Sequence, residues 1–253
     1  MLRLASLLSL ALVLAGALSF RLGLLPLGTS FSTLALGLVA CVLVSMTAAA
    51  LIFRRLARKQ KLGKLVMWLC LCLLPVAVVV SQVGLDSFHA PPIHDISTDL
   101  EQPPVFVFAQ SERVPGDNTL EHGGAALAEQ QRLGYPQLKP LHVTASQADA
   151  WAAAKAVIAD KQWRILGEDK DRGHIEAAAT TPLMGFTDDV VIRIGTAVSK
   201  DIAVGGSDEP RSPPVENLVI DVRSVSRVGV SDLGKNAARI DSFLNALQNQ
   251  LKN

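Results

Sequence analysis

Charge is unevenly distributed along this chain, and this limits what its first third can fold into. The first 85 residues carry eight Lys and Arg residues but no Asp or Glu, since the earliest acidic residue is Asp86. Three apolar runs lie within them, at about residues 4–27, 31–53 and 65–85. A helix that crosses the hydrocarbon core of a bilayer needs ~20 apolar residues. The sequence therefore predicts a transmembrane helical anchor over residues 1–85.

The first apolar run has two interpretations. It reaches the length of a spanning helix only if it continues past Arg21 to Leu27, with the Arg21 side chain extending to the interface. Alternatively, Arg3 and the sequence AGA at residues 15–17 resemble the n-region and cleavage site of a signal peptide. The chain stays apolar after Ala17, which favours a retained helix. Cleavage would leave the expected side of the polar part unchanged.

The orientation in the membrane follows from the segment between the second and third runs. Residues 54–64 contain six Lys and Arg residues, and short loops this basic stay on the cytoplasmic side. We therefore expect a multi-pass protein of the bacterial cytoplasmic (inner) membrane, with a cytoplasmic N-terminus and a periplasmic C-terminal part. The second and third runs contain no Asp, Glu, Lys, Arg or His, which favours an anchor over a transporter.

The composition of the polar part limits its partners. From Asp86 onward there are 23 acidic and 16 basic residues, a net charge of −7, which argues against nucleic acid binding. All three cysteines lie in apolar runs, so the polar part has no cysteine metal site or disulfide framework. His94, Asp95 and Asp99 are close in sequence, but no further ligand is near them. We predict no metal and no cofactor, and expect the lipid bilayer as a partner, with envelope proteins or anionic lipid as further candidates.

The polar part divides into a linker and a domain. Residues 86–104 are rich in Pro, Asp, Ser and Thr, as is typical of an extended linker. Residues 105–253 predict a soluble α+β domain. Apolar patterning predicts strands, at 105–110, 163–169, 173–180, 186–194 and 216–226.

Three helices are expected in this domain. One is a short helix at about 125–133, and a second follows Ser146, a good N-cap residue. The third follows Ser231 or Asp232 and carries one apolar stripe at 3–4 spacing, which predicts a long buried face. We expect an antiparallel sheet of about four or five strands, covered on one face by the last two helices.

The candidate functional residues lie in two strands and the start of the last helix. Adjacent strand residues point to opposite faces, so one carboxylate of the pair Asp188–Asp189 is expected to enter the layer below the helices, where it needs a cationic partner. Arg223, Arg227 and Arg239 are the cations at hand. The candidate set is Asp188, Asp189, Arg193, Asp221, Arg223, Ser224, Ser226, Arg227, Asp232, Asn236 and Arg239.

This set allows two interpretations. The residues could form a structural hub of ion pairs and hydrogen bonds that holds the last strand to the last helix. Alternatively, the arginines, the serine hydroxyls and the amino terminus of the last helix could converge on an anion or a lipid head group. The many carboxylates available to neutralise the arginines favour the structural hub.

The same residues carry a family resemblance. The segments FTDDVVIRI (186–194) and IDVRSVSRVGVSDLGKNAARI (220–240), with the spacing between them, resemble the signature of the bacterial family called domain of unknown function 1499. The upstream segments PPIHDISTDLEQPPVFV (91–107) and YPQLKPL (135–141) are similar to a membrane-anchored branch of that family. The resemblance runs from about Pro91 to the end of the chain, and it implies no particular activity.

Three functions remain open. No catalytic motif such as G-x-S-x-G or H-E-x-x-H is present, which favours a non-enzymatic outer-facing binding or envelope-maintenance domain. The second hypothesis is a lipid-carrying or hydrophobic-ligand-carrying domain, which requires an apolar cavity between the sheet and the last helix. The third is a hydrolase that uses Asp188 or Asp189 as a base, which requires that carboxylate in an open cleft.

Overall fold

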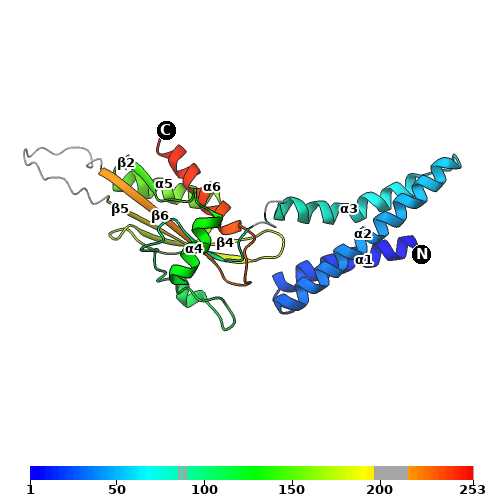
Figure 1. Ribbon diagram of the computed structural model, residues 1–253, viewed down its shortest axis with the longest axis horizontal. Coiled ribbons are helices and arrows are strands. Elements are labelled where there is room, and N and C mark those ends of the chain that lie inside the picture. Colours follow the sequence, from blue (N-terminus) through cyan, green and yellow to red (C-terminus); the bar gives the residue numbers. More distant parts are fainter. Residues whose placement is uncertain (85–86, 88–89, 197–215, 253) are drawn as a thin grey trace, which may run out of the picture. The chain divides into compact units, whose positions relative to one another are not determined.

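The chain forms two units. The computed structural model describes residues 1–84, 87, 90–196 and 216–252. The first unit is Met1–Ser87 together with Thr181–Gly185, and the second is Phe88–Thr180 together with Phe186–Asn253. The expected boundary between anchor and linker, at residues 85 and 86, lies outside the described residues. Figure 1 shows the helices and strands of the two units.

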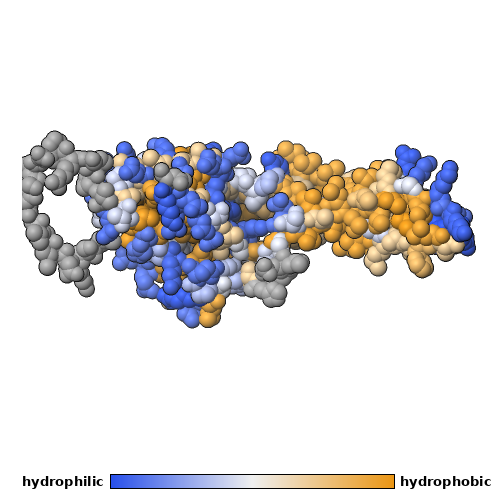
Figure 2. Space-filling view, turned by 90° about the horizontal axis from the view of Figure 1, so that it is seen from above, coloured by the Kyte–Doolittle hydropathy of each residue, from blue (hydrophilic) through white to orange (hydrophobic). Residues whose placement is uncertain are grey.

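The first unit is helical, as the sequence predicts. It contains α1 (Leu2–Arg21), α2 (Leu27–Ala57) and α3 (Gly63–Val83), all three long and apolar enough to cross a membrane. Their surfaces are mostly hydrophobic in Figure 2. The first helix ends at Arg21, not at Leu27, because Gly23 adopts a left-handed φ of 66° and Pro26 precedes the first residue of α2.

Two glycines allow α1 and α2 to pack closely. A Cβ atom added to Gly16 would lie 2.3 Å from the Leu34 nitrogen, and one added to Gly37 would lie 2.6 Å from the Val13 nitrogen. Small residues permit this backbone approach between membrane helices. Ser19 also donates a 2.9 Å hydrogen bond to Ser30 across the pair. The first two helices therefore form a tightly packed hairpin.

The second unit contains an antiparallel sheet, which confirms the predicted α+β class. Along the chain the strands are β1 (Asp95–Ser97), β2 (Leu141–Ala145), β3 (Arg164–Asp169), β4 (His174–Thr180), β5 (Thr187–Thr196) and β6 (Glu216–Ser226). Their order in the sheet is β1-β6-β5-β4-β3, and β2 also pairs with β6. The six strands are more than the four or five expected, because β1 and β2 both pair with the long strand β6.

Two expectations for the start of this unit are wrong in detail. The segment 86–104, expected as a linker, contributes the buried strand β1 to the sheet. Three residues are too few to show the alternation that identifies a strand. The expected strand at 105–110 is instead an irregular stretch that leads into a 3₁₀ turn, η2 (Ala109–Glu112). Burial alternates along this stretch, since Phe106 is buried whereas Val105 and Val107 are exposed.

Two helices cover one face of the sheet, as predicted. α5 (Gln147–Asp160) begins at Ser146, whose hydroxyl oxygen accepts the Asp149 N–H at 3.0 Å. α6 (Lys235–Gln250) lies beside it, with Ile240, Phe243 and Leu247 fully buried against the sheet. Side chains fill this layer, and the Phe243 ring stacks on Trp163. This packed layer counts against a lipid-carrying cavity beneath α6.

The opposite face of the sheet is covered by the irregular segment 98–120. Phe106 and Ala109 from this segment pack on Val191 of β5 and Val225 of β6. α4 (Gly124–Gly134), expected at 125–133, follows this segment. Its buried Gln131 donates to the Ser97 carbonyl at 2.6 Å and accepts the Ser97 N–H at 2.9 Å. The side-chain amide of Gln131 thereby satisfies the Ser97 backbone groups, which a neighbouring strand would otherwise pair with.

Candidate functional site

The candidate residues lie on both faces of the sheet. Along β6, Ser224 and Ser226 face α6, whereas Arg223 and Arg227 bond to the segment that covers the other face. Arg239 belongs to α6 and bonds to Ser224. The three arginines therefore do not converge on one pocket, and the candidates form two separate networks.

The network on the helix face joins β5 and β6 to α6. Ser224 donates to the Asn236 side-chain oxygen at 2.6 Å, and the Asn236 amide donates to Ser226 at 2.9 Å. Arg239 donates to Ser224 at 3.1 Å and forms an ion pair with Asp188. Asn236 is fully buried and Asp188 nearly so. These contacts hold the final helix to the two longest strands.

Asp232 lies just before α6 but does not occupy its N-cap position. The helix begins at Lys235, after Gly234, which has a φ of 80°. The Asp232 carboxylate accepts the Gly234 and Asn236 backbone N–H groups, each at 2.8 Å. Burial raises the pKa of Asp232, and the negative charge of Asp188 adds to this effect. Asp232 therefore stabilises the turn that precedes α6. It lies two residues before Gly234, which occupies the N-cap position.

Arg223 is the central residue of the network on the other face. Its Nε and Nη2 atoms donate to the two carboxylate oxygens of Asp95 at 2.9 and 2.8 Å. Nη1 donates to the Pro104 carbonyl at 3.1 Å and Nη2 to the Leu120 carbonyl at 2.8 Å. The guanidinium also lies 5.2 Å from the centroid of the Phe106 ring. These contacts fasten β1, and the covering segment at Pro104 and Leu120, to β6.

Asp189 is fully buried between two arginines of the same face. It accepts the Arg113 Nε–H at 2.7 Å and the Arg227 Nη2–H at 2.8 Å. Arg113 also donates to the Asn118 carbonyl, and Arg227 to the Glu112 carbonyl. Both arginines thus have carboxylate and backbone partners in the structure.

Arg193 and Asp221 form a third pair on this face, nearer to solvent. The Arg193 Nη2 atom lies 2.8 Å from both Asp221 and Asp99. Asp221 also accepts a 3.3 Å hydrogen bond from the Thr98 hydroxyl. Asp99 belongs to the segment expected as a linker, so this pair provides a further attachment of that segment to the sheet.

Sequence reasoning missed Glu176, a fully buried carboxylate of β4. It accepts backbone N–H groups from Val107, Phe108 and Ala109, and lies 2.6 Å from His174 Nε2. Burial would raise the pKa of Glu176, but the hydrogen bonds from His174 and the three backbone groups outweigh it, so the pKa is lowered. The sequence feature that could have identified Glu176 is a single acidic residue between the isoleucine and the three alanines of the strand HIEAAAT.

Catalysis by Asp188 or Asp189 finds little support in this arrangement. Both carboxylates are buried and both are held in ion pairs with arginine, so neither lies in an open cleft. Among the residues that the structure describes, no three His, Cys, Asp or Glu side chains are grouped closely enough to hold a metal ion. The geometry fits the structural hub better than an anion site or a hydrolase.

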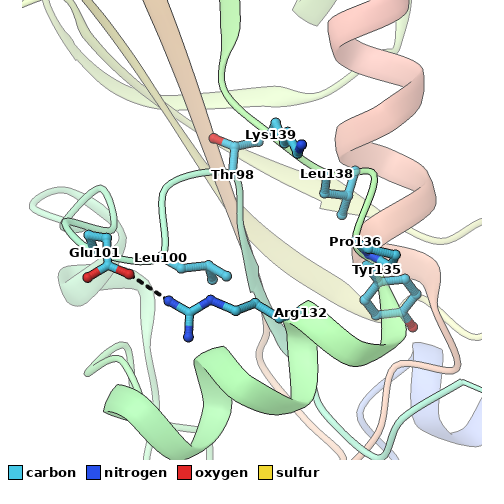
Figure 3. Close-up of a pocket in the computed structure, with 8 residues that line it drawn as sticks. All are labelled: Thr98, Leu100, Glu101, Arg132, Tyr135, Pro136, Leu138 and Lys139. Atoms are coloured by element: carbon cyan, nitrogen blue, oxygen red, sulfur yellow. Dashed lines mark hydrogen bonds and ion pairs between the residues drawn. The ribbon is translucent and has the colours of Figure 1, made fainter.

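An open groove of about 300 Å³ lies elsewhere, beside the end of α4 (Figure 3). Its walls are mixed in chemistry, and they comprise Thr98, Leu100, Glu101, Arg132, Tyr135, Pro136, Leu138 and Lys139. Arg132 reaches across to Glu101, with 2.6 Å between Nη2 and the carboxylate, and both side chains are exposed. Within the described part of the chain, the exposed Lys139 forms no ion pair with an acidic residue.

Tyr135 forms one wall of this groove and is the only tyrosine in the chain. Its ring lies beside Pro136, and its hydroxyl points away from Leu100 and Arg132 (Figure 3). The hydroxyl is buried, 3.2 Å from where a Cβ atom of Gly234 would lie. Burial, with the nearby Asp232, raises the pKa of Tyr135 to about 12. The groove thus has an uncharged aromatic wall.

Comparison with known proteins identifies the family of the chain. A family model described as "Protein of unknown function (DUF1499)" matches residues 95–247, more than half of the chain. The matched range begins at β1 and includes both networks and the groove. No curated protein matches the chain.

Proposed function

On the premise that the chain belongs to the DUF1499 family, we propose that it is a membrane-anchored binding protein whose groove beside α4 takes a small anionic amphiphile. The description of the family assigns no activity, so the proposal is argued from geometry alone. The observation that carries it is Lys139, an exposed cation without an ion-pair partner in the described residues, on the wall of a partly apolar groove.

The charges of the two networks support this choice of site. Arg223 and Arg227 already contact carboxylates and backbone carbonyls, so an anion could reach them only by displacing a buried partner. Removing one partner of a buried ion pair costs about 3–5 kcal/mol. An anion that binds Lys139 displaces no such partner, because among the described residues Lys139 forms no ion pair with an acid.

Arg132 supplies a second cation that can turn toward a ligand. Its ion pairs with Glu101 and Glu129 are exposed on both sides, and exposed pairs contribute only about 0–1 kcal/mol each. A phosphate or carboxylate group between Arg132 and Lys139 would meet two positive charges. Leu100, Pro136 and Leu138 would contact an apolar chain. A volume of about 300 Å³ is at the small end of ligand pockets, so a short single chain fits better than a two-chain lipid.

The proposal places this domain on the outer side of the membrane. The basic segment 54–64 includes the end of α2 and the start of α3, and it keeps the α2–α3 connection in the cytoplasm. The first helix is retained in this proposal, because its close packing on α2 at Gly16 gives it a structural role. In a bacterium with two membranes the domain is periplasmic, where anionic amphiphiles derived from the envelope are available.

The test uses Tyr135 as a probe. Because it is the only tyrosine, the full chain labelled with 3-fluorotyrosine in lipid nanodiscs has a single ¹⁹F tyrosine resonance, from the groove wall. Decyl phosphate and decanoate should shift this resonance saturably, whereas decyltrimethylammonium, of opposite charge, should not. A resonance that stays in place with both anions, or moves equally with the cation, would contradict the proposed site.

A further inference from the structure

A cluster of apolar side chains surrounds the place where the second unit begins. Ala90 and Pro91 pack on two glycines: a Cβ atom on Gly134 would lie 2.6 Å from Pro91, and one on Gly234 would lie 3.7 Å from Ala90. Next to these glycines lie Leu133, 78% exposed, and Leu233, 39% exposed. The turn before α6 adds Val230, also 78% exposed.

One backbone hydrogen bond and one side-chain contact fix this turn to the beginning of the unit. Asp232 donates its N–H to the Ile93 carbonyl at 3.1 Å, and the His94 ring lies 3.1 Å from the Val230 carbonyl. The end of α4 and the turn before α6 therefore flank residues 90–94 from two sides. We call the exposed apolar residues Leu133, Val230 and Leu233 the entry cluster.

The length of the chain ties the entry cluster to the membrane. The last spanning helix, α3, ends at Val83, and Ala90 is seven residues further on. Fully extended, seven residues span at most about 25 Å. A domain of this size is about 40 Å across. The side of the unit at Ala90 therefore has to remain close to the bilayer surface, while the opposite side cannot reach it.

We propose that the entry cluster docks on the lipid surface of the leaflet at which α3 ends. Leu133, Val230 and Leu233 would insert into the interface between head groups and acyl chains, where apolar side chains are favoured. This explains why three large apolar side chains are exposed beside the tether. The proposal depends on the anchor and the tether length, and it does not depend on which side of the membrane the domain occupies.

Docking has a consequence for the groove. Tyr135 follows Leu133 by two residues and forms one of the groove walls. A docked entry cluster would bring that wall next to lipid, so that an amphiphile could pass between membrane and groove without crossing water. This consequence rests on the proposed function, whereas the docking itself does not.

Brominated lipids test the docking directly, because they quench tryptophan fluorescence only at short range. The background is the full chain with Trp68→Phe, which removes the tryptophan of α3. Val230→Trp and Leu133→Trp each place a new indole in the entry cluster. Val107→Trp is the matched control, since Val107 is 59% exposed on the segment whose backbone contacts Glu176 of β4. All variants are placed in nanodiscs with lipid brominated near the top of its acyl chains.

In both entry-cluster variants the brominated lipid should quench a larger fraction of the fluorescence of the introduced tryptophan than it does in Val107→Trp. These residues are highly exposed, so the substitutions leave the core intact, and the use of two positions guards against a local defect. Equal quenching of Val230→Trp and Val107→Trp would overturn the proposal, as would a loss of emission at only one of the two entry-cluster positions. The groove probe at Tyr135 takes no part in this measurement, so the two proposals can fail independently.

Discussion

Arg223 and Asp95 form a buried two-point ion pair, with Nε–Oδ1 and Nη2–Oδ2 distances of 2.9 and 2.8 Å. Arg223 lies in β6, which carries four of the candidate residues, and Asp95 lies in β1, which follows the anchor. Because Arg223 also bonds to the Pro104 and Leu120 carbonyls, it attaches the covering segment to the sheet at two points. The polarity of β6 is thereby explained mainly by the fold.

The first prediction follows from this pair. Arg223→Met leaves Asp95 buried without its cation, which should lower the free energy of unfolding by about 3–5 kcal/mol. The measurement is urea unfolding of the full chain in nanodiscs, followed by tryptophan fluorescence. Lys170→Met, at an exposed position, is the control and should change stability by less than about 0.5 kcal/mol. Equal midpoints for the two variants would show that Arg223 is not a structural residue.

Glu176 makes stability depend on pH. Its pKa lies below the usual 4.5, because His174 and three backbone N–H groups outweigh the effect of burial. The ionised form is therefore favoured in the folded state, so its stabilisation is present above pH 4.5 and is lost as the pH falls through the lowered pKa. Glu176→Gln should remove this part of the acid dependence.

Unfolding midpoints measured between pH 7 and pH 3 test this prediction. Glu121→Gln, at an exposed carboxylate outside the network, is the matched control and should keep the acid dependence of the native chain. At neutral pH, Glu176→Gln should also be less stable by about 1–3 kcal/mol, since charge-assisted hydrogen bonds are lost. If both variants lose stability in parallel with the native chain as the pH falls, Glu176 does not have the assigned role.

Membrane orientation gives a third prediction. A reporter enzyme that is active only in the periplasm should be active when fused after Asn253, and inactive when fused within the basic segment 54–64. The reason is the retention of basic loops in the cytoplasm. A cytoplasm-active reporter at the same two positions is the control and should show the reverse activities. Activity of the periplasmic reporter within 54–64 would invert the proposed topology.

Much of the architecture was readable from the sequence, because it depends on periodic patterns. Apolar length gave the three membrane helices, and Ser146 marked the start of α5. The C-terminal end of α1 and the first residue of α6 were misplaced, because left-handed glycines, Gly23 and Gly234, determine where these helices stop and start. Apolar patterns do not report backbone dihedral angles.

The candidate site was harder to predict than the fold. Alternation along β6 places Arg223 and Ser224 on opposite faces of the sheet, but it does not identify which segments pack against each face. The partners Asp95, Arg113 and Glu176 come from short or irregular segments or from an otherwise apolar strand. Pairing over such distances depends on tertiary contacts, which a local pattern does not record. The groove was missed for the same reason, since Leu100 and Lys139 are far apart in the sequence but line the same groove in the fold.

The central claim is that the buried arginines are structural and that the groove at Lys139 binds the ligand. Its most direct test is the ¹⁹F titration of fluorotyrosine-labelled full chain with decyl phosphate, in four proteins: native, Lys139→Glu, Lys170→Glu and Arg227→Gln. Loss of one charge-assisted contact should raise the half-saturation concentration of Lys139→Glu about tenfold. Native protein, Lys170→Glu and Arg227→Gln should saturate at the same concentration. Unchanged binding by Lys139→Glu, together with lost binding by folded Arg227→Gln, would contradict the account and assign the ligand to the arginine network.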